Sequence, residues 1–192
     1  MIEIRRLGDP ATMAVIHGSG VDLVCPFPLD QLKLVYQWLH AHPTLTEHDD
    51  SPGSAEHYEL LMSLQLSVCT SYGLLRAGTT SGLIGMLHFE PSGTRNGYLH
   101  IAMSHSAWGR GLADEAAALC IQELFEKQPA LTRLSAAMLE RNRAAQSLAR
   151  RMGFTLEATL ADMVLQQGTP RSILHYGLTR RDWERLRGEK SA

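Results

Sequence analysis

The chain has 192 residues, of which 44% are hydrophobic and 20% are charged, and its formal net charge is −2. This length favours one domain over residues 1–192, with enough apolar side chains for a core. The balanced charge, without any basic block, argues against a nucleic-acid partner. No apolar stretch reaches the length of a membrane span, so we also expect no membrane partner.

Three cysteines, Cys25, Cys69 and Cys120, are far apart in the sequence and form no paired motif. Their odd number and their apolar neighbours predict reduced, buried thiols, which are typical of the cytoplasm. The first residues, MIEIRRLGDP, contain no apolar core of a secretory leader. We therefore expect a cytoplasmic protein.

The first third of the chain predicts one strand followed by three helices. Alternating apolar residues predict the strand, while an Asp-Pro pair and apolar residues at helical spacing predict the helices. The expected elements are a strand over 1–7, a short helix from Asp9 to about His17, and helices over 28–40 and from Ser54. The last of these helices carries an apolar stripe formed by Tyr58, Leu61, Met62 and Leu66. A polar segment rich in turn-forming residues, 43–54, precedes it.

From residue 67 onward the apolar residues follow the period of strands, interrupted by two clear helices. The expected elements are strands over 67–78, 81–91, 98–104 and 131–139, helices after Gly111 and after Asn142, a hairpin of 155–166 with 172–179, and a short closing helix. Because most of these strands are joined by short glycine-containing turns, the sheet is expected to be mostly antiparallel. The sequence therefore predicts one α+β domain.

The stretch HSAWGRGLADEAA, residues 105–117, runs from a predicted strand through two glycines into a predicted helix. A helix N-terminus presents unpaired N–H groups and partial positive charge, which suit a phosphate group. Gly109 and Gly111 would let the backbone approach such a ligand, Ala113 keeps the first turn small, and Arg110 would add charge. A tight turn whose glycines serve its geometry alone explains these residues equally well.

A second motif, NRAAQSLARRMGF over 142–154, follows one helix and one strand later. With both motifs, the sequence resembles the GCN5-related N-acetyltransferases, the GNAT superfamily, whose pyrophosphate loop reads Q/R-x-x-G-x-G/A. WGRGLADEA over 108–116 is similar to the loop of the branch that acetylates ribosomal-protein N-termini, the RimJ/RimL type. Asn142 and the Met152-Gly153-Phe154 run are similar to the next segment of that branch. The resemblance covers about residues 83–183.

The resemblance implies a three-layer α/β/α fold whose seven-stranded sheet splays between its fourth and fifth strands, 98–104 and 131–139. Acetyl-CoA would lie in the opening and pair with the backbone of Ile101 and Met103, and no metal is implied. Residues 83–183 would then form the acetyl-CoA-binding core and closing hairpin, and residues 1–67 the acceptor side. The implied cofactor contacts come from the loop and the next helix: Trp108, Gly109, Arg110, Gly111, Leu112, Ala113, Asn142 and Arg143.

Two of these implied contacts have a simpler alternative. Asn142 is also a suitable N-cap for the helix that follows it, and we expect it to serve both roles. Arg143 would approach the adenosine phosphates, although a solvated helix residue is the favoured explanation for it.

Acetyl transfer needs a neutral amine, a polarised thioester carbonyl and a proton for the leaving thiolate. The backbone N–H of Met103 is the candidate for polarising the carbonyl. Many GNAT relatives carry a glutamate near the start of the fourth strand as general base, but this chain has Gly97 and Tyr98 there. Relatives also carry a serine or tyrosine on the helix after Asn142, where this chain has Ala145 and Ala149.

Histidine and tyrosine side chains are the remaining candidates for proton transfer. His100 and Tyr98 would share one face of a strand, and histidine titrates near physiological pH. His88 would be the neighbour of His100 across the sheet, although a structural role is favoured for it. His175 and Tyr176 in the last strand are the other candidates.

The leading hypothesis is an acetyl-CoA-dependent N-acetyltransferase that transfers acetyl to a primary amine, either a protein or peptide N-terminus or a small molecule, by direct attack of the amine on the thioester. The alternative is a non-catalytic acyl-CoA-binding or protein-interaction module on the same fold, because the usual acid and base residues are replaced. Glu47, Asp49 and Asp50 in the polar segment would attract a cationic acceptor, or would simply form a solvated loop. A homodimer is left open.

Overall fold

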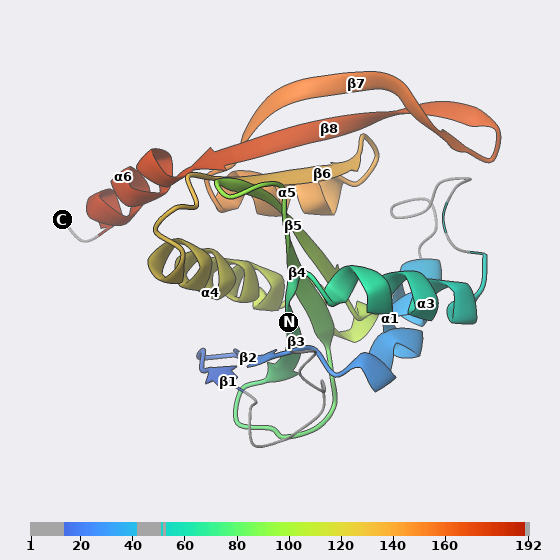
Figure 1. The fold of residues 1–192 in the computed structure, drawn as a ribbon, viewed down its shortest axis with the longest axis horizontal. Helices are drawn as coiled ribbons and strands as arrows, with labels where there is room; N and C mark the ends of the chain where they lie inside the picture. Colours follow the sequence, from blue (N-terminus) through green and yellow to red (C-terminus); the bar gives the residue numbers. More distant parts are fainter. Residues whose placement is uncertain (1–13, 42–50, 52, 191–192) are drawn as a thin grey trace, which may run out of the picture.

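The structure is a computed structural model that describes residues 14–41, 51 and 53–190. In this part of the chain it has eight strands and five α-helices (Figure 1). The strands are β1 (Ala14–Ile16), β2 (Val21–Cys25), β3 (Thr70–Arg76), β4 (Gly85–Pro91), β5 (Asn96–Met103), β6 (Arg133–Leu139), β7 (Thr155–Gln166) and β8 (Thr169–Thr179). The helices are α1 (Leu32–His40), α3 (Ala55–Leu66), α4 (Leu112–Lys127), α5 (Arg143–Arg151) and α6 (Arg180–Lys190).

The eight strands form one sheet in the order β1-β2-β3-β4-β5-β6-β8-β7. Every neighbouring pair is antiparallel except β5 and β6, which are parallel. Figure 1 shows β6–β8 lying across the top of the molecule, while β3–β5 run down from them. The predicted α+β class with a mostly antiparallel sheet is confirmed, and the sheet has eight strands in place of the seven expected.

The beginning of the sheet differs from the prediction. The helix expected to end near His17 is wrong over Ala14–Ile16, which form β1, and no element was expected where β2 lies. Four of the five residues of β2 are buried, so this strand lacks the alternation that marks a half-exposed strand. Asp22, within β2, accepts hydrogen bonds from the backbone N–H groups of Gly78 (3.0 Å) and Gly18 (3.3 Å). The strand predicted over 1–7 and the start of that helix lie outside the described residues.

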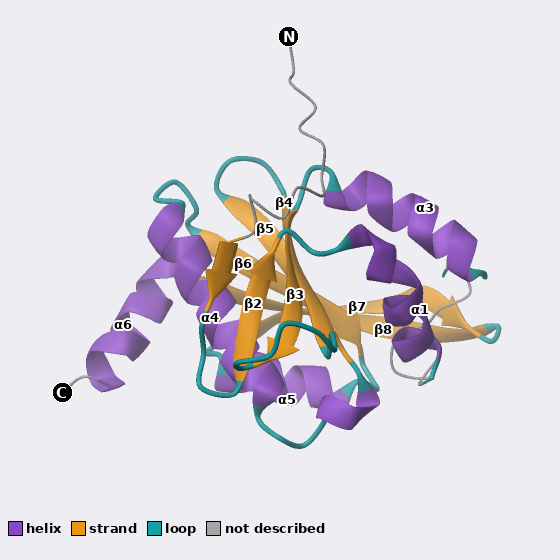
Figure 2. Cartoon of the chain, turned by 90° about the horizontal axis from the view of Figure 1, so that it is seen from below, coloured by secondary structure: helices purple, strands orange, loops and turns teal. Residues whose placement is uncertain are grey.

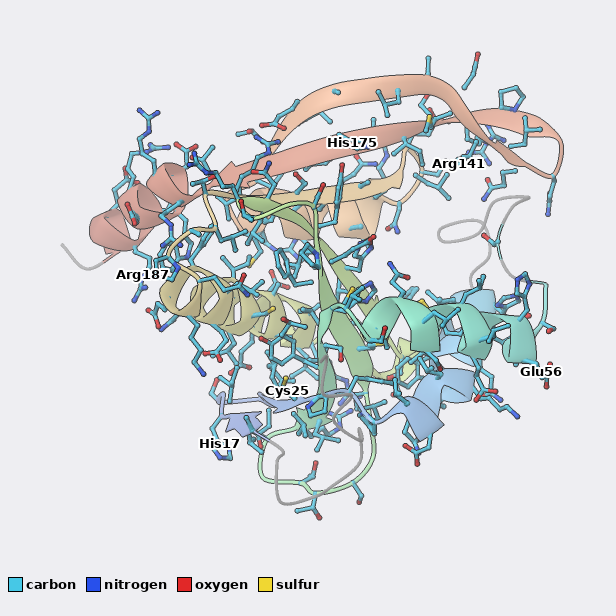
Figure 3. The ribbon with its side chains drawn as sticks, viewed as in Figure 1. His17, Cys25, Glu56, Arg141, His175 and Arg187 are labelled. Carbon is cyan, nitrogen blue, oxygen red and sulfur yellow. The ribbon has the colours of Figure 1, made fainter. Side chains whose placement is uncertain are left out.

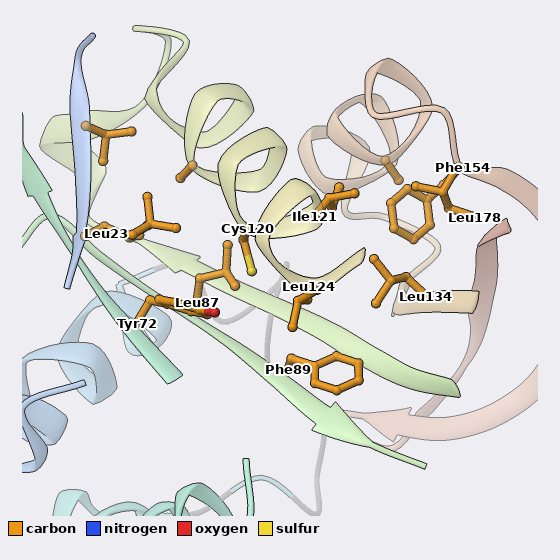
Figure 4. Close-up of a cluster of buried hydrophobic side chains, with 14 of the residues drawn as sticks. Leu23, Tyr72, Leu87, Phe89, Cys120, Ile121, Leu124, Leu134, Phe154 and Leu178 are labelled. Carbon is orange, nitrogen blue, oxygen red and sulfur yellow. The ribbon is translucent and has the colours of Figure 1, made fainter. Parts of the chain in front are cut away.

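Helices cover both faces of the sheet and give three layers (Figure 2). On one face, α4 packs its buried side chains, among them Cys120, Ile121 and Leu124, onto Leu87 and Phe89 of β4 (Figure 4). On the other face, α1 and α3 form a smaller apolar cluster with Met86 and Phe27, built from Leu32, Val35, Tyr58, Met62 and Leu66. The sheet is therefore shared by two apolar clusters.

Helices α3 and α5 begin directly after the N-cap residues that the sequence predicted, Ser54 and Asn142. The Ser54 side chain accepts a hydrogen bond from the backbone N–H of His57 (3.2 Å) and starts α3. The Asn142 side chain accepts one from the backbone N–H of Ala145 (3.0 Å) and starts α5. The apolar stripe expected on α3 is buried except at Leu61, which is 44% exposed, so that assignment is wrong for Leu61.

The three cysteines are free thiols. Cys120 is buried as expected, but Cys25 and Cys69 are only half-buried. Within the described residues, no helix combines the length and apolarity that crossing a membrane would require.

Candidate functional site

Strands β5 and β6 separate shortly after they meet. Their parallel pairing covers only three positions, Asn96–Tyr98 of β5 against Arg133–Ser135 of β6. Beyond Tyr98, β5 continues to Met103 beside β4, while β6 continues to Leu139 beside β8. The sheet therefore opens at the place that the family resemblance implied, between residues 98–104 and 131–139.

The pairing of β5 with β4 fixes which backbone groups face this opening. Ser104 N–H donates to Ile84 C=O, and Ser92 N–H donates to Asn96 C=O, both at 2.8 Å. Because backbone groups alternate in direction along an antiparallel strand, even-numbered residues of β5 direct their N–H and C=O toward β4. The backbone groups of Ile101 and Met103 consequently face the opening, where β6 no longer pairs with them.

The glycine loop closes one end of the opening. Gly109 and Gly111 both adopt positive φ, 68° and 74°, and Gly111 is the N-cap of α4. Gly111 has no side chain to cap this helix, which leaves the amides of its first turn for a ligand. The Trp108 indole N–H donates to the Met103 carbonyl (3.2 Å) and ties the loop to the end of β5.

Two side chains of the loop region have roles that the sequence did not distinguish. Leu112 is only 8% exposed and belongs to the core, so it offers the loop its backbone alone. Arg110 is exposed beside the two glycines.

Asp114, in the first turn of α4, is paired with Arg151 of α5, and Arg151 Nη2 lies 3.1 Å from Asp114 Oδ2. This pair neutralises a carboxylate that would otherwise repel an anion at the loop.

Two cavities meet at the opening. The α4–α5 cavity, of ≈ 460 Å³, is lined by the glycine loop, Met103, Trp108 and Arg151. The α1–α3 cavity, of ≈ 530 Å³, extends from Tyr36, Tyr58 and Met62 past the sheet to β6. Both are lined by Leu39, Ile101, Ala102, Asn142, Ala145 and Leu148. A ligand seated on the loop and one seated under α1 and α3 would therefore meet beside Ile101.

Two histidines and a glutamate lie where β4 and β5 face α1 and α3. His88 pairs with His100 across the two strands, and their rings stack with centroids 4.4 Å apart and planes 9° apart. Glu90 pairs with Tyr98, and its Oε2 lies 3.3 Å from His100 Nε2. Gln65 of α3 donates to the same Glu90 oxygen at 2.8 Å. The predicted proximity of His88, His100 and Tyr98 is confirmed.

Burial keeps both imidazoles neutral. Burial, with a smaller contribution from the nearby His100, lowers the pKa of His88 to about 3. Burial also lowers the pKa of His100, while the Glu90 carboxylate opposes that shift. Neither ring nitrogen of His88 has a hydrogen-bond partner among the described residues, so it is not the satisfied core histidine that the sequence favoured.

Other predicted residues lie further from this group. Tyr176 is 1% exposed, accepts a hydrogen bond from Arg150 (3.0 Å) and lines neither cavity, so it belongs to the core. His175 lies along β8 (Figure 3), with its ring 6.0 Å from that of Tyr98. Arg143 is exposed, donates to Gln146 (3.2 Å) and lines neither cavity. The polar segment over 43–50 lies outside the described residues.

Sequence reasoning missed Glu90. The family resemblance implied a glutamate at residues 97 or 98 of β5, whereas Glu90 lies opposite Tyr98 on the neighbouring strand β4. The signal was present in the turn at 92–95, because a hairpin closed by residues 92 and 96 places residue 90 opposite 98 and 88 opposite 100.

Residues 24–155 match the family model described as the acetyltransferase (GNAT) domain. The chain therefore belongs to the GNAT acetyltransferase family, and the resemblance seen in its motifs is confirmed. A search of curated proteins finds no match.

Solved structures share the fold. A probable GNAT-family acetyltransferase from Chromobacterium violaceum is 19% identical, with 89% of this chain and 88% of that one covered and a TM-score of 0.73. RimL, a ribosomal L7/L12 alpha-N-protein acetyltransferase in complex with coenzyme A, is 13% identical, with 86% and 98% covered and a TM-score of 0.71. The ribosomal-protein-S5-alanine acetyltransferase from Vibrio fischeri is 15% identical, with 88% and 98% covered and a TM-score of 0.71.

Proposed function

We propose that this protein is an acetyl-CoA-dependent N-acetyltransferase that transfers an acetyl group to a primary amine. One observation carries the proposal: the backbone edge of β5 at Ile101, which β6 leaves unpaired, lies where the two cavities meet. A donor held along this edge from one cavity and an amine held in the other would be brought together at β5. We place the reaction in the cytoplasm, and the three free thiols support this location.

The residues around the α4–α5 cavity fit coenzyme A. The positive φ of Gly109 and Gly111 and the uncapped start of α4 suit a pyrophosphate, and the exposed Arg110 adds charge. The open edge at Ile101 and Met103 suits the amide groups of a pantetheine arm, with the Asn142 side chain on the opposite wall. When bound, acetyl-CoA supplies the acyl group as a thioester. The Met103 N–H then polarises the carbonyl of that thioester.

The acceptor enters from the α1–α3 cavity in this proposal. Its wall is mostly apolar, and His88, His100 and Gln65 are among its polar residues. RimL and the Vibrio fischeri protein are named for acetylating ribosomal proteins, which supports a protein or peptide N-terminus as acceptor, alongside small-molecule amines. The attacking amine must be neutral and loses a further proton as the N–C bond forms. His100, which lines this cavity next to Ile101 on β5, is the base that we propose for that proton.

The experiment that tests this function follows release of free thiol from acetyl-CoA in the presence of a panel of amines and peptide N-termini. We expect release that depends on at least one amine. Stable binding of acetyl-CoA, with no release on any amine, would identify a non-catalytic acyl-CoA-binding module instead.

We expect His100→Ala to lower kcat/KM by about 10²-fold or less, the low end of what proton relays contribute. Backbone polarisation and positioning remain in this variant, so activity does not vanish. The acid limb of the kcat/KM profile should also disappear, since that limb reports deprotonation of His100. A variant that keeps both the parent rate and the parent profile would show that His100 is structural.

A further inference from the structure

We infer that Glu90 is a positioning residue that holds His100 with its proton on Nε2, so that Nδ1 is the atom that accepts the amine proton. This inference rests on the proposed function and names the device by which His100 serves it. The group is assembled from three elements: Glu90 comes from β4, His100 from β5 and Gln65 from α3.

The two ring nitrogens of His100 have different surroundings. Nε2 is buried and lies 3.3 Å from Glu90 Oε2, an ion-pair distance, but without the geometry of a hydrogen bond. Nδ1 is not among the buried atoms, and no described residue forms a hydrogen bond with it. A negatively charged oxygen at this distance attracts an N–H and repels a ring lone pair, so Glu90 favours the tautomer with hydrogen on Nε2. The lone pair then lies on Nδ1, the nitrogen that a ligand can reach.

Neighbouring side chains hold this geometry from two sides. The Gln65 amide donates to Glu90 Oε2 at 2.8 Å and fixes the carboxylate against α3. The ring of His88 stacks on that of His100, with only 9° between their planes, and limits its rotation. His88 is 5% exposed and stays neutral, so it adds no charge beside His100. The imidazole therefore keeps one orientation before any ligand arrives.

The proton balance is closed within this group. His100 Nδ1 accepts a proton from the amine nitrogen as the new N–C bond forms. His100 then returns that proton to the sulfur as the C–S bond breaks, which leaves a neutral thiol and a neutral imidazole. Glu90 keeps its charge throughout and stabilises the imidazolium while it carries two protons. No oxidant, reductant or further reactant is needed.

Several titratable groups contact His100, contact its neighbours or line the same cavity. They are Glu90 and His88 from β4, Tyr98 beside it on β5, His175 from β8, Tyr36 and His40 from α1, Tyr58 from α3, and Cys69 beside Glu90. Glu90 is the carboxylate whose charge opposes the effect of burial on the pKa of His100. Removing that charge should therefore lower the pKa of His100 further.

The test replaces the carboxylate with an amide of the same shape. Glu90→Gln should lower kcat/KM about tenfold and move its acid limb to lower pH by about one unit, the low end for a charge within 4–6 Å, because both side chains are partly exposed. Glu184→Gln removes a carboxylate of α6 that is 58% exposed, and it serves as the control with parent kinetics. An unshifted limb in Glu90→Gln would overturn the inference.

A double-mutant cycle separates positioning from a general structural effect. If Glu90 acts through His100, Glu90→Gln should cause no further loss in the His100→Ala background. A full tenfold loss in that background would contradict the inference, while leaving the proposed acetyl transfer intact. If the acid limb is lost in His100→Ala but is unshifted in Glu90→Gln, the role of Glu90 is contradicted and the proposed acetyl transfer still stands.

A spectroscopic measurement needs no acetyl-CoA. In protein labelled with ¹⁵N histidine, the ring nitrogens of His100, assigned by comparison with His100→Ala, should show hydrogen on Nε2 at neutral pH. Glu90→Gln should reduce this preference. Hydrogen on Nδ1 in the parent protein would overturn the inference whatever the activity of the variants.

Discussion

Gly111→Asp should abolish the stabilisation of this protein by acetyl-CoA. A ligand that binds only the native state stabilises it by about 2.7 kcal/mol at 100 times its Kd, which appears as a higher Tm. An aspartate at the N-cap of α4 would place a side chain and a negative charge where the pyrophosphate is proposed to lie. The amides there are uncapped in the parent chain. The Tm of the variant should therefore not respond to acetyl-CoA.

The control must carry the same charge and the same backbone strain. Gly168, in the turn between β7 and β8, has φ of 69° against 74° for Gly111, and an added Cβ meets nothing within 4 Å at either position. Gly168→Asp should lower the Tm as much as Gly111→Asp does, yet keep the full response to acetyl-CoA. If acetyl-CoA raises the Tm of Gly111→Asp as much as that of the parent, the glycine loop is not part of the binding site.

His88 should make the protein sensitive to acid. In the unfolded chain its pKa returns to 6.5, whereas in the folded protein it is about 3. Between these values the unfolded state binds more protons, so the free energy of unfolding falls as pH falls from 6.5 toward 3. At 1.36 kcal/mol per unit, this single histidine removes about 2–3 kcal/mol by pH 4.5.

The measurement compares urea unfolding at pH 7 and pH 4.5 in the parent and in His88→Phe. Phenylalanine keeps an aromatic ring against His100 but does not titrate, so the variant should lose about 2–3 kcal/mol less than the parent over this interval. Each protein is compared only with itself, by the change in its free energy of unfolding between the two pH values. Any effect of the larger ring on packing is present at both pH values and cancels. Equal losses in both proteins would show that His88 is not the group responsible.

Elements with strong caps and clear periodicity could be predicted from sequence. The α4 and α5 helices begin where Gly111 and Asn142 indicate, and the opening of the sheet lies between the strands that the motifs identified. The helix starts depend on local chemistry, which a short segment contains in full, whereas the opening was implied by the family resemblance that the two motifs carry. The match to the GNAT family model shows that the two motifs together identified the family correctly.

The features that were missed depend on contacts between distant segments. β2 is buried on both faces, so it lacks the alternation of a half-exposed strand, and the longer of its two partners, β3, begins 45 residues after its end. Glu90 belongs to the site only because β4 and β5 pair in one register, which places it opposite Tyr98. The burial that lowers the pKa of His88 likewise comes from packing around the sheet.

The most direct test of the account is a mass measurement of both protein and acceptor. The central claim is direct transfer, with donor and amine held together at the edge of β5. The protein mixed with acetyl-CoA alone should keep its mass, and addition of an accepted amine should then give acetylated amine in step with free coenzyme A. An acetyl group found on the protein before the amine is added, or no acetylated amine from any acceptor, would contradict it.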